Sequence, residues 1–345
     1  SVACFHDEHY AKLRAAYALP VDFLASIHFE KMAHNGGKGG MAMGFTTDKR
    51  YIVKELNDTD HKTMLKIAED FVDHVMDTAV GSLLARIFAH FERANKVYVV
   101  MNNWMPPPRY EKLPKDFAFV KKAYSQYDLK GCADDKTLTR AGEKVGAVHK
   151  RIFSLHMWFG TLFWTPARRH YHEGKLHARD VQFPVSARDH ADICAKVERD
   201  VAFLRKYQLM DYSLVVSYHF LPRCTPALLN DVFRGTSDQS QPYVGFLQKR
   251  GHQQAVVLYL GVIDFLQDWT FKKVVAQCIK VAERNKATVP PDPYGERFAR
   301  YVARKFVATC TDDDEQAAAA AQDDDVSEVK NAPAAAEEEP PSDQV

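Results

Sequence analysis

The run of residues 256–263 (Val-Val-Leu-Tyr-Leu-Gly-Val-Ile) is followed at once by a carboxylate, Asp264. An apolar run of this length indicates a buried β-strand, and the apolar residues Phe265 and Leu266 continue the chain beyond the charge. A carboxylate in such a place is unfavourable unless a cation compensates it. We therefore expect Asp264 to ligate a metal ion, because hard cations prefer carboxylate oxygens.

A second strand-like segment, residues 50–54 (Arg-Tyr-Ile-Val-Lys), ends in Lys54 and follows a glycine turn at residues 36–40 (Gly-Gly-Lys-Gly-Gly). Glycine lets the backbone approach a phosphate closely and point N–H groups at it. Turns with several glycines are also common in plain hairpins, and this one lacks the Gly-Lys-Ser/Thr ending of a P-loop NTPase. The turn is informative only together with partners elsewhere in the chain.

The third segment, residues 210–213 (Met-Asp-Tyr-Ser), joins an expected helix to an apolar run. On its own, Asp211 fits a turn that terminates a helix. Transfer of a phosphoryl group from ATP requires a lysine that neutralises phosphate charge, an aspartate that holds magnesium and another that orients the attacking hydroxyl. We therefore predict a kinase whose active site contains Lys54, Asp211 and Asp264.

Two Ala-Arg-Asp segments, residues 178–180 and 187–189, look like the core of a protein-kinase catalytic loop. That loop needs an asparagine five residues beyond its aspartate to hold the second magnesium ion. Val185 and Cys194 occupy those two positions. The chain is therefore not an ordinary protein kinase.

The charge of the chain is distributed unevenly. Of its 46 basic and 45 acidic residues, one and 12 respectively lie in residues 311–345, so residues 1–310 carry a net charge of +12. The C-terminal segment is rich in Ala and Pro and has few large apolar residues, so we expect a disordered acidic tail. The basic remainder attracts a polyanion, and nucleic acid, an anionic membrane surface and a phosphorylated substrate remain open at this point.

The six cysteines are scattered without close pairs, which argues against a disulfide framework and against a zinc site built from cysteines. A reducing cytosol is the compartment that such a pattern favours. No stretch approaches the roughly 20 apolar residues needed to span a bilayer. No signal-peptide pattern follows Ser1, so we expect an excised domain rather than a secreted protein.

Hydrophobic periodicity predicts helices within residues 9–25, 63–79 and 192–207, and strands at residues 96–101 and 125–131. A glutamate on the second helix, Glu69, is a possible partner of Lys54, although a solvated position on the helix surface is favoured. The segment from Asp134 to Lys175 contains no motif that indicates a chemical function.

These segments, taken in order, resemble those of the phosphatidylinositol-phosphate kinase family. The glycine turn corresponds to the family's Ser-Gly-Lys-Ser-Gly, and residues 48–54 (Asp-Lys-Arg-Tyr-Ile-Val-Lys) are close to its Asp-Asp-Arg-Phe-Ile-Ile-Lys. Further matches are residues 99–103 (Val-Val-Met-Asn-Asn), 127–131 (Tyr-Asp-Leu-Lys-Gly), 198–200 (Glu-Arg-Asp), 210–214 (Met-Asp-Tyr-Ser-Leu), 260–267 (Leu-Gly-Val-Ile-Asp-Phe-Leu-Gln) and 294–298 (Tyr-Gly-Glu-Arg-Phe).

The resemblance implies an α+β fold with two lobes, distantly related to protein kinases, with an antiparallel sheet in each lobe. The N-terminal lobe is expected at residues 1–183 with the glycine loop and the ATP-binding lysine. The C-terminal lobe is expected at residues 184–310 with the catalytic aspartate, the magnesium aspartate and a specificity loop, followed by the acidic tail at residues 311–345. ATP and magnesium are expected in the cleft and a phosphoinositide headgroup at its mouth.

The family's functional residues carry over to matching positions of this chain. By that resemblance Lys54 binds the ATP phosphates, Asp211 is the catalytic aspartate, Asp264 holds magnesium and Lys130 contacts phosphate. The glycine loop that covers the ATP phosphates comprises Gly37, Lys38, Gly39 and Gly40. Residues 177–183 look like the family's linker between the lobes, so adenine contacts are expected from Asp180 and Phe183, although Val181 and Gln182 depart from the usual residues.

Residues 271–284 form an amphipathic pattern, with apolar residues on one helical face and Lys272, Lys273, Lys280 and Arg284 elsewhere. Such a helix is suited to the interface of an anionic membrane, although a helix packed on the core gives the same pattern. The resemblance favours membrane docking, because the family's specificity loop lies here. Val275 matches neither the Glu of members that phosphorylate the 4-phosphate nor the Ala of those that use the 5-phosphate.

The leading prediction is ATP-dependent conversion of a phosphatidylinositol monophosphate, the 4-phosphate at its 5-hydroxyl, to a bisphosphate at the cytosolic face of a membrane. The alternatives are a phosphatidylinositol 5-phosphate 4-kinase, a pseudokinase-like module that binds phosphoinositides, and a kinase of soluble inositol phosphates. The expected partners are the lipid substrate and an anionic membrane surface, without nucleic acid. Family members often dimerise through the N-terminal lobe, so a homodimer is one state open to this chain.

Overall fold

A computed structural model describes residues 2–25, 27–29, 32–34, 41–105, 124–148, 164–222, 243–249, 252–269 and 289–308 of the chain. Several predicted features lie outside these residues. They are the glycine loop with Gly37, Lys38, Gly39 and Gly40, the membrane helix with Lys272, Lys273 and Val275, and the acidic tail at residues 311–345.

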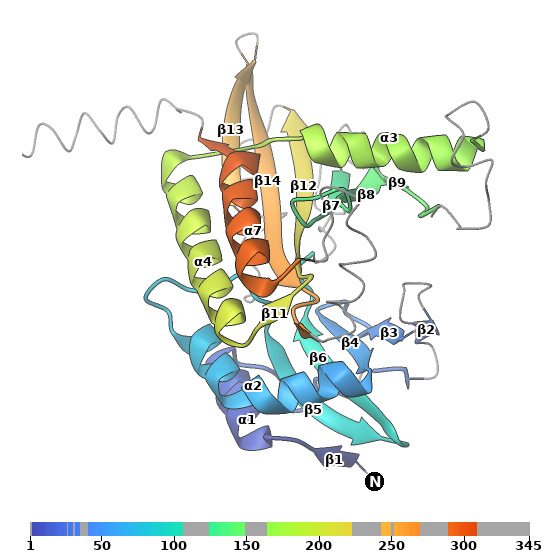
Figure 1. Cartoon of the computed structure of the whole chain (residues 1–345), viewed down its shortest axis with the longest axis vertical. Helices are drawn as coiled ribbons and strands as arrows, with labels where there is room; N and C mark the ends of the chain where they lie inside the picture. The colour runs from blue at the N-terminus through green and yellow to red at the C-terminus, as the bar shows by residue number, and fades with distance from the viewer. Residues whose placement is uncertain are drawn as a thin grey trace, which may run out of the picture.

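The lower half of the molecule in Figure 1 is built on a six-stranded antiparallel sheet. Its strands, in spatial order, are β1 (Val2–Cys4), β5 (Ile87–Arg93), β6 (Lys96–Asn102), β4 (Tyr51–Leu56), β3 (Ala42–Phe45) and β2 (Ala33–His34). Tyr51, Val53 and Leu56 of β4 are buried. Lys54 lies on the same strand, paired with Met43 of β3 and Val99 of β6, so its backbone is fixed on both sides.

Two helices accompany this sheet, α1 (Asp7–Ala16) and α2 (Asp58–Met76). The apolar positions of α2 repeat at helical spacing and are buried, among them Met64, Ile67 and Phe71. The helix begins at Asp58 because the side chain of Asn57 caps it, accepting a hydrogen bond from the backbone N–H of Asp60 at 2.9 Å. It thus starts a turn earlier than apolar spacing alone predicts.

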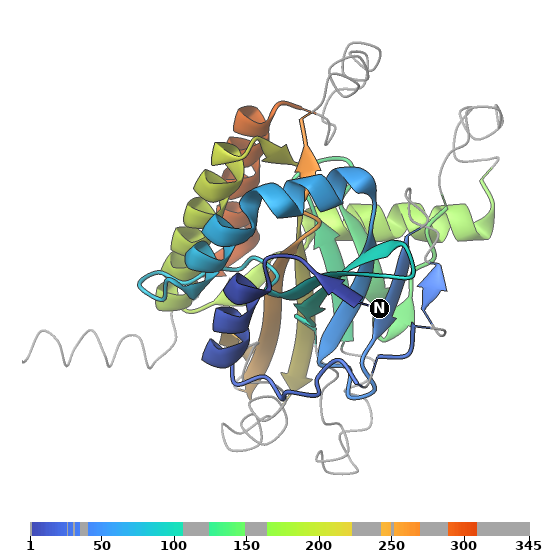
Figure 2. The same cartoon turned by 90° about the horizontal axis from the view of Figure 1, so that it is seen from below.

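The upper half of Figure 1 contains a second six-stranded antiparallel sheet. Its strands, in spatial order, are β13 (Tyr243–Lys249), β14 (His252–Ile263), β12 (Ser213–Pro222), β7 (Tyr124–Leu129), β8 (Lys136–Arg140) and β9 (Glu143–Lys144). Helices α4 (Ala187–Lys206) and α7 (Pro291–Lys305) lie side by side, and α3 (Pro166–Asp180) packs near β8 (Figure 2). Two short pairs complete the fold: β10 (Phe183–Val185) with β16 (Phe306–Ala308), and β11 (Leu209–Met210) with β15 (Gln267–Asp268).

The mixed α/β fold with two antiparallel sheets is therefore confirmed. The change from the first sheet to the second falls between β6 and β7, at residues 103–123, whereas the predicted lobe boundary lies after residue 183. Strands β7, β8 and β9 join the second sheet because β7 pairs along its length with β12. Such a pairing between segments far apart in the chain leaves no mark in the periodicity of either strand.

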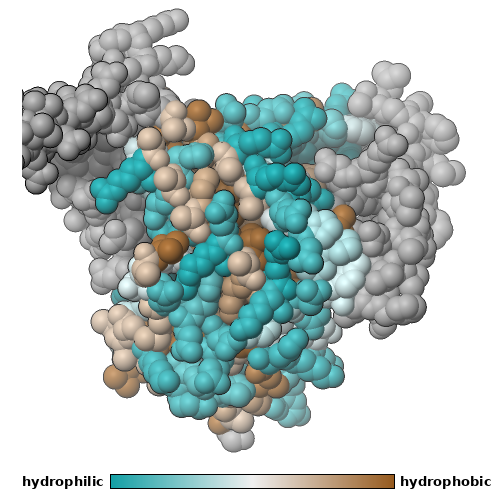
Figure 3. Space-filling model, turned by 60° about the vertical axis from the view of Figure 1, so that its left-hand side comes forward, coloured by the Kyte–Doolittle hydropathy of each residue, from teal (hydrophilic) through white to brown (hydrophobic). Residues whose placement is uncertain are grey.

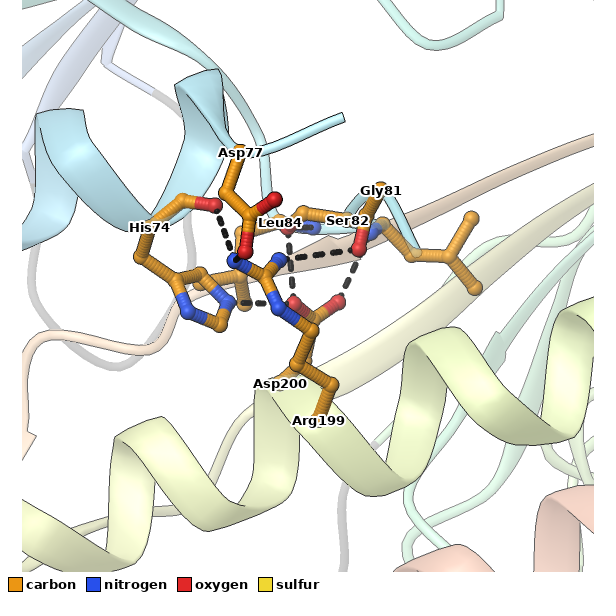
Figure 4. A network of polar contacts seen from close by, with 8 residues as sticks. His74, Asp77, Gly81, Ser82, Leu84, Arg199 and Asp200 are labelled. Atoms are coloured by element: carbon orange, nitrogen blue, oxygen red, sulfur yellow. Dashed lines mark hydrogen bonds and ion pairs between the residues drawn. The ribbon is translucent and has the colours of Figure 1, made fainter. Parts of the chain in front are cut away.

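One buried carboxylate, Asp200 of α4, ties the two halves together (Figure 4). It accepts hydrogen bonds from the backbone N–H of Leu83 and the hydroxyl of Ser82, and its Oδ1 lies 2.7 Å from Nε2 of His74 at the end of α2. The neighbouring Arg199 donates to the backbone oxygens of Gly81 and His74. Residues 74–83 of the first half are thereby held against α4 of the second.

The same segment then pairs with the second sheet. The backbone N–H of Val262 in β14 donates to the carbonyl of Leu83 at 2.7 Å, and the N–H of Ala85 donates to the carbonyl of Val262 at 2.9 Å. Three residues beyond Val262, Phe265 stacks on Phe71 of α2 with ring centroids 5.7 Å apart. Buried apolar residues of both halves consequently form one continuous core.

The side of the molecule that lies to the left in Figure 1 is largely hydrophilic, with apolar side chains interspersed among charged ones (Figure 3). The large exposed apolar residues of the described chain include Val21 in the turn after α1, Phe45 at the end of β3 and Met76 at the end of α2. No helix among the described residues is long and apolar enough to cross a bilayer.

We expect Asp200→Ala to lower the free energy of unfolding by about 3 kcal/mol, because it leaves the buried N–H of Leu83 and the side chains of Ser82 and His74 without their acceptor. Urea unfolding of the full chain measures this. The matched control is Asp292→Asn, which breaks an exposed ion pair with Arg205 and should change stability by less than about 1 kcal/mol. Equal losses in both variants would show that Asp200 is not the tie between the halves.

Candidate functional site

Three predicted site residues lie at one edge of the second sheet. The strand register aligns the end of β7, the start of β12 and the end of β14 at that edge. Lys130 directly follows β7, Asp264 directly follows β14, and Asp211 lies just before β12. Residues that are 53 to 134 positions apart in the chain are thus gathered by strand pairing alone.

Lys54 reaches the same edge from the first sheet. Its Nζ lies 2.6 Å from Oδ1 of Asp264, and this ion pair joins β4 of one half to the end of β14 in the other. The side chain of Lys54 is 27% exposed and that of Asp264 is 48% exposed. The pair is therefore open to solvent, so a phosphate and a cation have access to it.

The charges at this edge shift the pKa of both members of the pair. Desolvation acts to raise the pKa of Asp264, but the charge and hydrogen bond of Lys54, helped by Lys130 and Lys136, hold that pKa below its usual value. For Lys54 desolvation acts to lower the pKa, and the charge of Asp264 together with that of Asp60 raises it instead. Asp264 is an anion and Lys54 a cation at neutral pH.

The second pair at the site is Asp211 with Lys130. Nζ of Lys130 donates to Oδ1 and to the backbone oxygen of Asp211, each at 2.5 Å. The side chain of Lys130 is 16% exposed and that of Asp211 is 30% exposed. Asp211 and Asp264 both adopt left-handed backbone conformations, with φ of 65° and 59°. This conformation is uncommon for residues other than glycine and is concentrated at functional sites.

Buried contacts hold the backbone on either side of this pair. The backbone N–H groups of Lys130 and Gly131 donate to Oδ1 of Asp135 at 2.6 and 2.9 Å. Gly131 has φ of 70°, and a Cβ there would lie 2.9 Å from the ring of Tyr301, so a side chain is excluded. On the other side, the hydroxyl of Tyr294 donates to the carbonyl of Tyr212. Tyr294 and Gly131 belong to the segments that resemble the kinase family, and each supports a charged residue at the site.

Lys136 is a site residue that the sequence analysis did not identify. Its Nζ lies 2.7 Å from Oδ2 of Asp128, and it contributes to the lowered pKa of Asp264. It begins β8, inside a segment in which we found no readable chemistry. In the sequence, Lys136 is simply a lysine that follows Lys130 after a turn. Its place beside Asp128 becomes evident only from the pairing of β8 with β7.

Two predicted adenine contacts are not brought to this edge. Asp180 ends α3, is largely exposed and pairs with its neighbour Arg179 at 2.8 Å. Phe183 is fully buried, and its ring packs against the rings of Tyr127 and Phe306. Residues 177–183 are not the connection between the two sheets, because the chain crosses at 103–123. The adenine contacts of Asp180 and Phe183 stay predictions that rest on the resemblance to the family.

Glu69 of α2 is exposed, and Lys54 pairs with Asp264. The solvated position favoured for this glutamate by the sequence is the one observed. The ion-pair partner of Lys54 is therefore Asp264 and not Glu69.

A sequence model of the phosphatidylinositol-4-phosphate 5-kinase family matches residues 27–245 and 229–305. The chain is 22% identical to phosphatidylinositol 4-phosphate 5-kinase 3 of Arabidopsis thaliana, in a match that covers 79% of this chain and 39% of that protein. It is 21% identical to phosphatidylinositol 4-phosphate 5-kinase type-1 alpha of Rattus norvegicus, over 82% of this chain and 53% of the relative. It is also 21% identical to phosphatidylinositol 5-phosphate 4-kinase type-2 gamma of Danio rerio, over 83% and 72%.

We expect Lys54→Met to raise the pKa of Asp264. The substitution removes the charge and hydrogen bond of Lys54, which lower that pKa most, while desolvation continues to raise it. Carbon-13 NMR of the aspartate carboxyl carbons, followed through a pH titration, measures the shift. Lys96→Met is the matched control, since Lys96 pairs at 3.1 Å with Glu55 and not with Asp264. An unchanged pKa of Asp264 in Lys54→Met would contradict the pairing described above.

Proposed function

Because this chain belongs to the phosphatidylinositol-4-phosphate 5-kinase family, we propose that it transfers the terminal phosphoryl group of ATP to the 5-hydroxyl of phosphatidylinositol 4-phosphate. The observation that carries the proposal is the ion pair between Lys54 and Asp264, which lies beside the pair of Asp211 and Lys130. Phosphoryl transfer depends on placing opposite charges around the transferring group, and these four residues supply them from both halves of the molecule.

In this proposal Lys54 neutralises charge on the ATP phosphates. Asp211 orients the attacking hydroxyl and accepts its proton, while Lys130, which now holds the Asp211 carboxylate, contacts phosphate. The glycine loop of residues 36–40 covers the nucleotide phosphates, by resemblance to the family.

The residues at this edge also fit a magnesium ion. Lys54 engages Oδ1 of Asp264, and the carboxylate is 48% exposed, so it retains oxygen that can face a cation. Magnesium is bound in such sites by one or two carboxylates together with substrate phosphates. When bound, the ion would neutralise charge on the phosphate oxygens, and Asp264 is the residue that would hold it.

Lys130 and Lys136, each now paired with an aspartate, are the cations that would contact the phosphate of a phosphorylated inositol ring. The choice of the 4-phosphate follows the family model and the relatives named as 5-kinases. A relative named as a 5-phosphate 4-kinase keeps the other isomer as the alternative, because Val275 matches neither subclass.

For the site to meet a lipid, the protein has to reach a membrane. The basic amphipathic residues 271–284 are the proposed contact, with Lys272 and Lys273 facing anionic lipid at the cytosolic surface. The edge position of β1 in the first sheet makes pairing between two copies a further proposal, since an edge strand presents free backbone groups.

The test is transfer of labelled phosphate from ATP and magnesium to vesicles that each contain one phosphatidylinositol monophosphate isomer. We expect label in the 4-phosphate, and a loss of about 10²–10⁴-fold in Asp211→Asn, which removes the proton acceptor. Asp292→Asn, an exposed aspartate of α7, is the matched control and should retain activity. Label that enters the 5-phosphate instead would select the alternative isomer.

Two comparisons in the same assay separate the remaining functions. Lys272→Ala with Lys273→Ala should weaken vesicle binding and lipid phosphorylation together, because both depend on the basic surface. Undiminished activity in that variant would favour a soluble inositol phosphate as substrate. Vesicle binding without labelling of any isomer would favour a pseudokinase-like binding module and overturn the enzymatic proposal.

A further inference from the structure

Three potential metal ligands meet where β1 leads into α1, in a part of the molecule that the proposed kinase site does not use. His6, Glu8 and His9 each offer a donor atom, and these three atoms all lie within 4.8 Å of one another. Nδ1 of His6 is 3.9 Å and Nε2 of His9 is 3.7 Å from Oε1 of Glu8. Two imidazoles and one carboxylate are the protein ligands found in several catalytic zinc sites.

The backbone at His6 brings these side chains together. His6 precedes the first residue of α1 and adopts a left-handed conformation with φ of 49° and ψ of 37°. This conformation is uncommon outside glycine, and the side chain of His6 makes no capping hydrogen bond that would explain it. The conformation leaves the His6 imidazole beside Glu8 and close to His9 in the first turn of the helix.

The three donor atoms are not hydrogen-bonded to one another. Separations of 3.7 and 3.9 Å are longer than hydrogen bonds, so a metal ion displaces no hydrogen bond between them. Nδ1 of His9 is buried and has no hydrogen-bond partner among the described residues. No hydrogen bond donated to Nδ1 by a described residue fixes the proton of the imidazole on Nε2. Nδ1 can therefore carry the proton, and Nε2 can present its lone pair to a metal.

The surroundings favour a neutral, open site. Arg14, in the last turn of α1, is paired with Asp7 at 2.8 Å. His90 lies behind the site against Phe5, and burial lowers its pKa to about 3, so it adds no positive charge. The side chains of His6 and Glu8 are 41% and 69% exposed, which leaves water free to complete the coordination.

We propose that His6, Glu8 and His9 form a binding site for a divalent transition-metal ion, with Zn²⁺ as the ion that best suits this ligand set. Ligand atoms about 2.1 Å from a tetrahedral zinc ion lie about 3.4 Å apart, so small rotations of the exposed side chains close the set. The site needs no cysteine and is separate from Asp264. A bound ion joins the residue that follows β1 to the first turn of α1, and thereby fixes the start of the first half.

The test is a calorimetric titration of the full chain, freed of metal by a chelator, with ZnCl₂ at neutral pH. We expect wild type to bind one more Zn²⁺ per chain than the double variant His6→Gln/His9→Gln. Glu8→Gln should bind at this site at least tenfold more weakly. Zinc binding should weaken as the pH falls, because protons compete with the metal for the imidazole lone pairs. Zinc should raise the thermal unfolding midpoint of wild type more than that of the double variant.

His170→Gln is the matched control, because His170 is an exposed histidine of α3 outside this cluster. It should bind as many Zn²⁺ ions as wild type. Equal stoichiometry and affinity in wild type and the double variant would overturn the proposal. Glu8 is exposed, so its substitution leaves the fold intact, and unchanged affinity in Glu8→Gln would also overturn it. None of these results depends on kinase activity.

Discussion

The buried carboxylate of Asp200 is the constraint from which the placement of the site follows. It fixes the backbone N–H of Leu83, and the carbonyl of Leu83 in turn receives the N–H of Val262 in β14. Asp264 lies two residues beyond Val262, so the segment that leaves α2 positions the end of β14 against the first sheet. The ion pair with Lys54 forms across that junction. A contact between α4 and a loop thus determines where a lysine from one sheet meets an aspartate from the other.

Within the second sheet, antiparallel pairing brings together the strand ends that carry Lys130, Asp211 and Asp264. Because β7 and β14 run in the same direction on either side of β12, the residues that follow them emerge at one edge. That edge carries two lysine–aspartate pairs, and both aspartates adopt left-handed backbone conformations. The alternating charges neutralise each other in the free protein, and each is available to a ligand of opposite charge. In the proposed reaction, phosphate and metal would exchange one set of ion pairs for another.

Much of this was predictable from local patterns. The apolar run that ends in Asp264, the strand that carries Lys54 and the ordered motifs indicated the family, which the family match confirms. Helix starts were predicted too late where the caps Asn57 and Ser186 were overlooked. Sheet membership of β7, the role of Lys136 and the partners of Asp200 depend on contacts between residues far apart in the chain. No local pattern encodes such contacts.

The most direct test of the central claim is the affinity for ATP, measured with and without Mg²⁺ in wild type and in Asp264→Asn. If Asp264 holds the metal beside the nucleotide phosphates, Mg²⁺ tightens ATP binding in wild type and has little effect in the variant, whose amide is a weak magnesium ligand. If Mg²⁺ tightens ATP binding equally in both proteins, the metal lies elsewhere and the assignment of this edge as the phosphoryl-transfer site is contradicted.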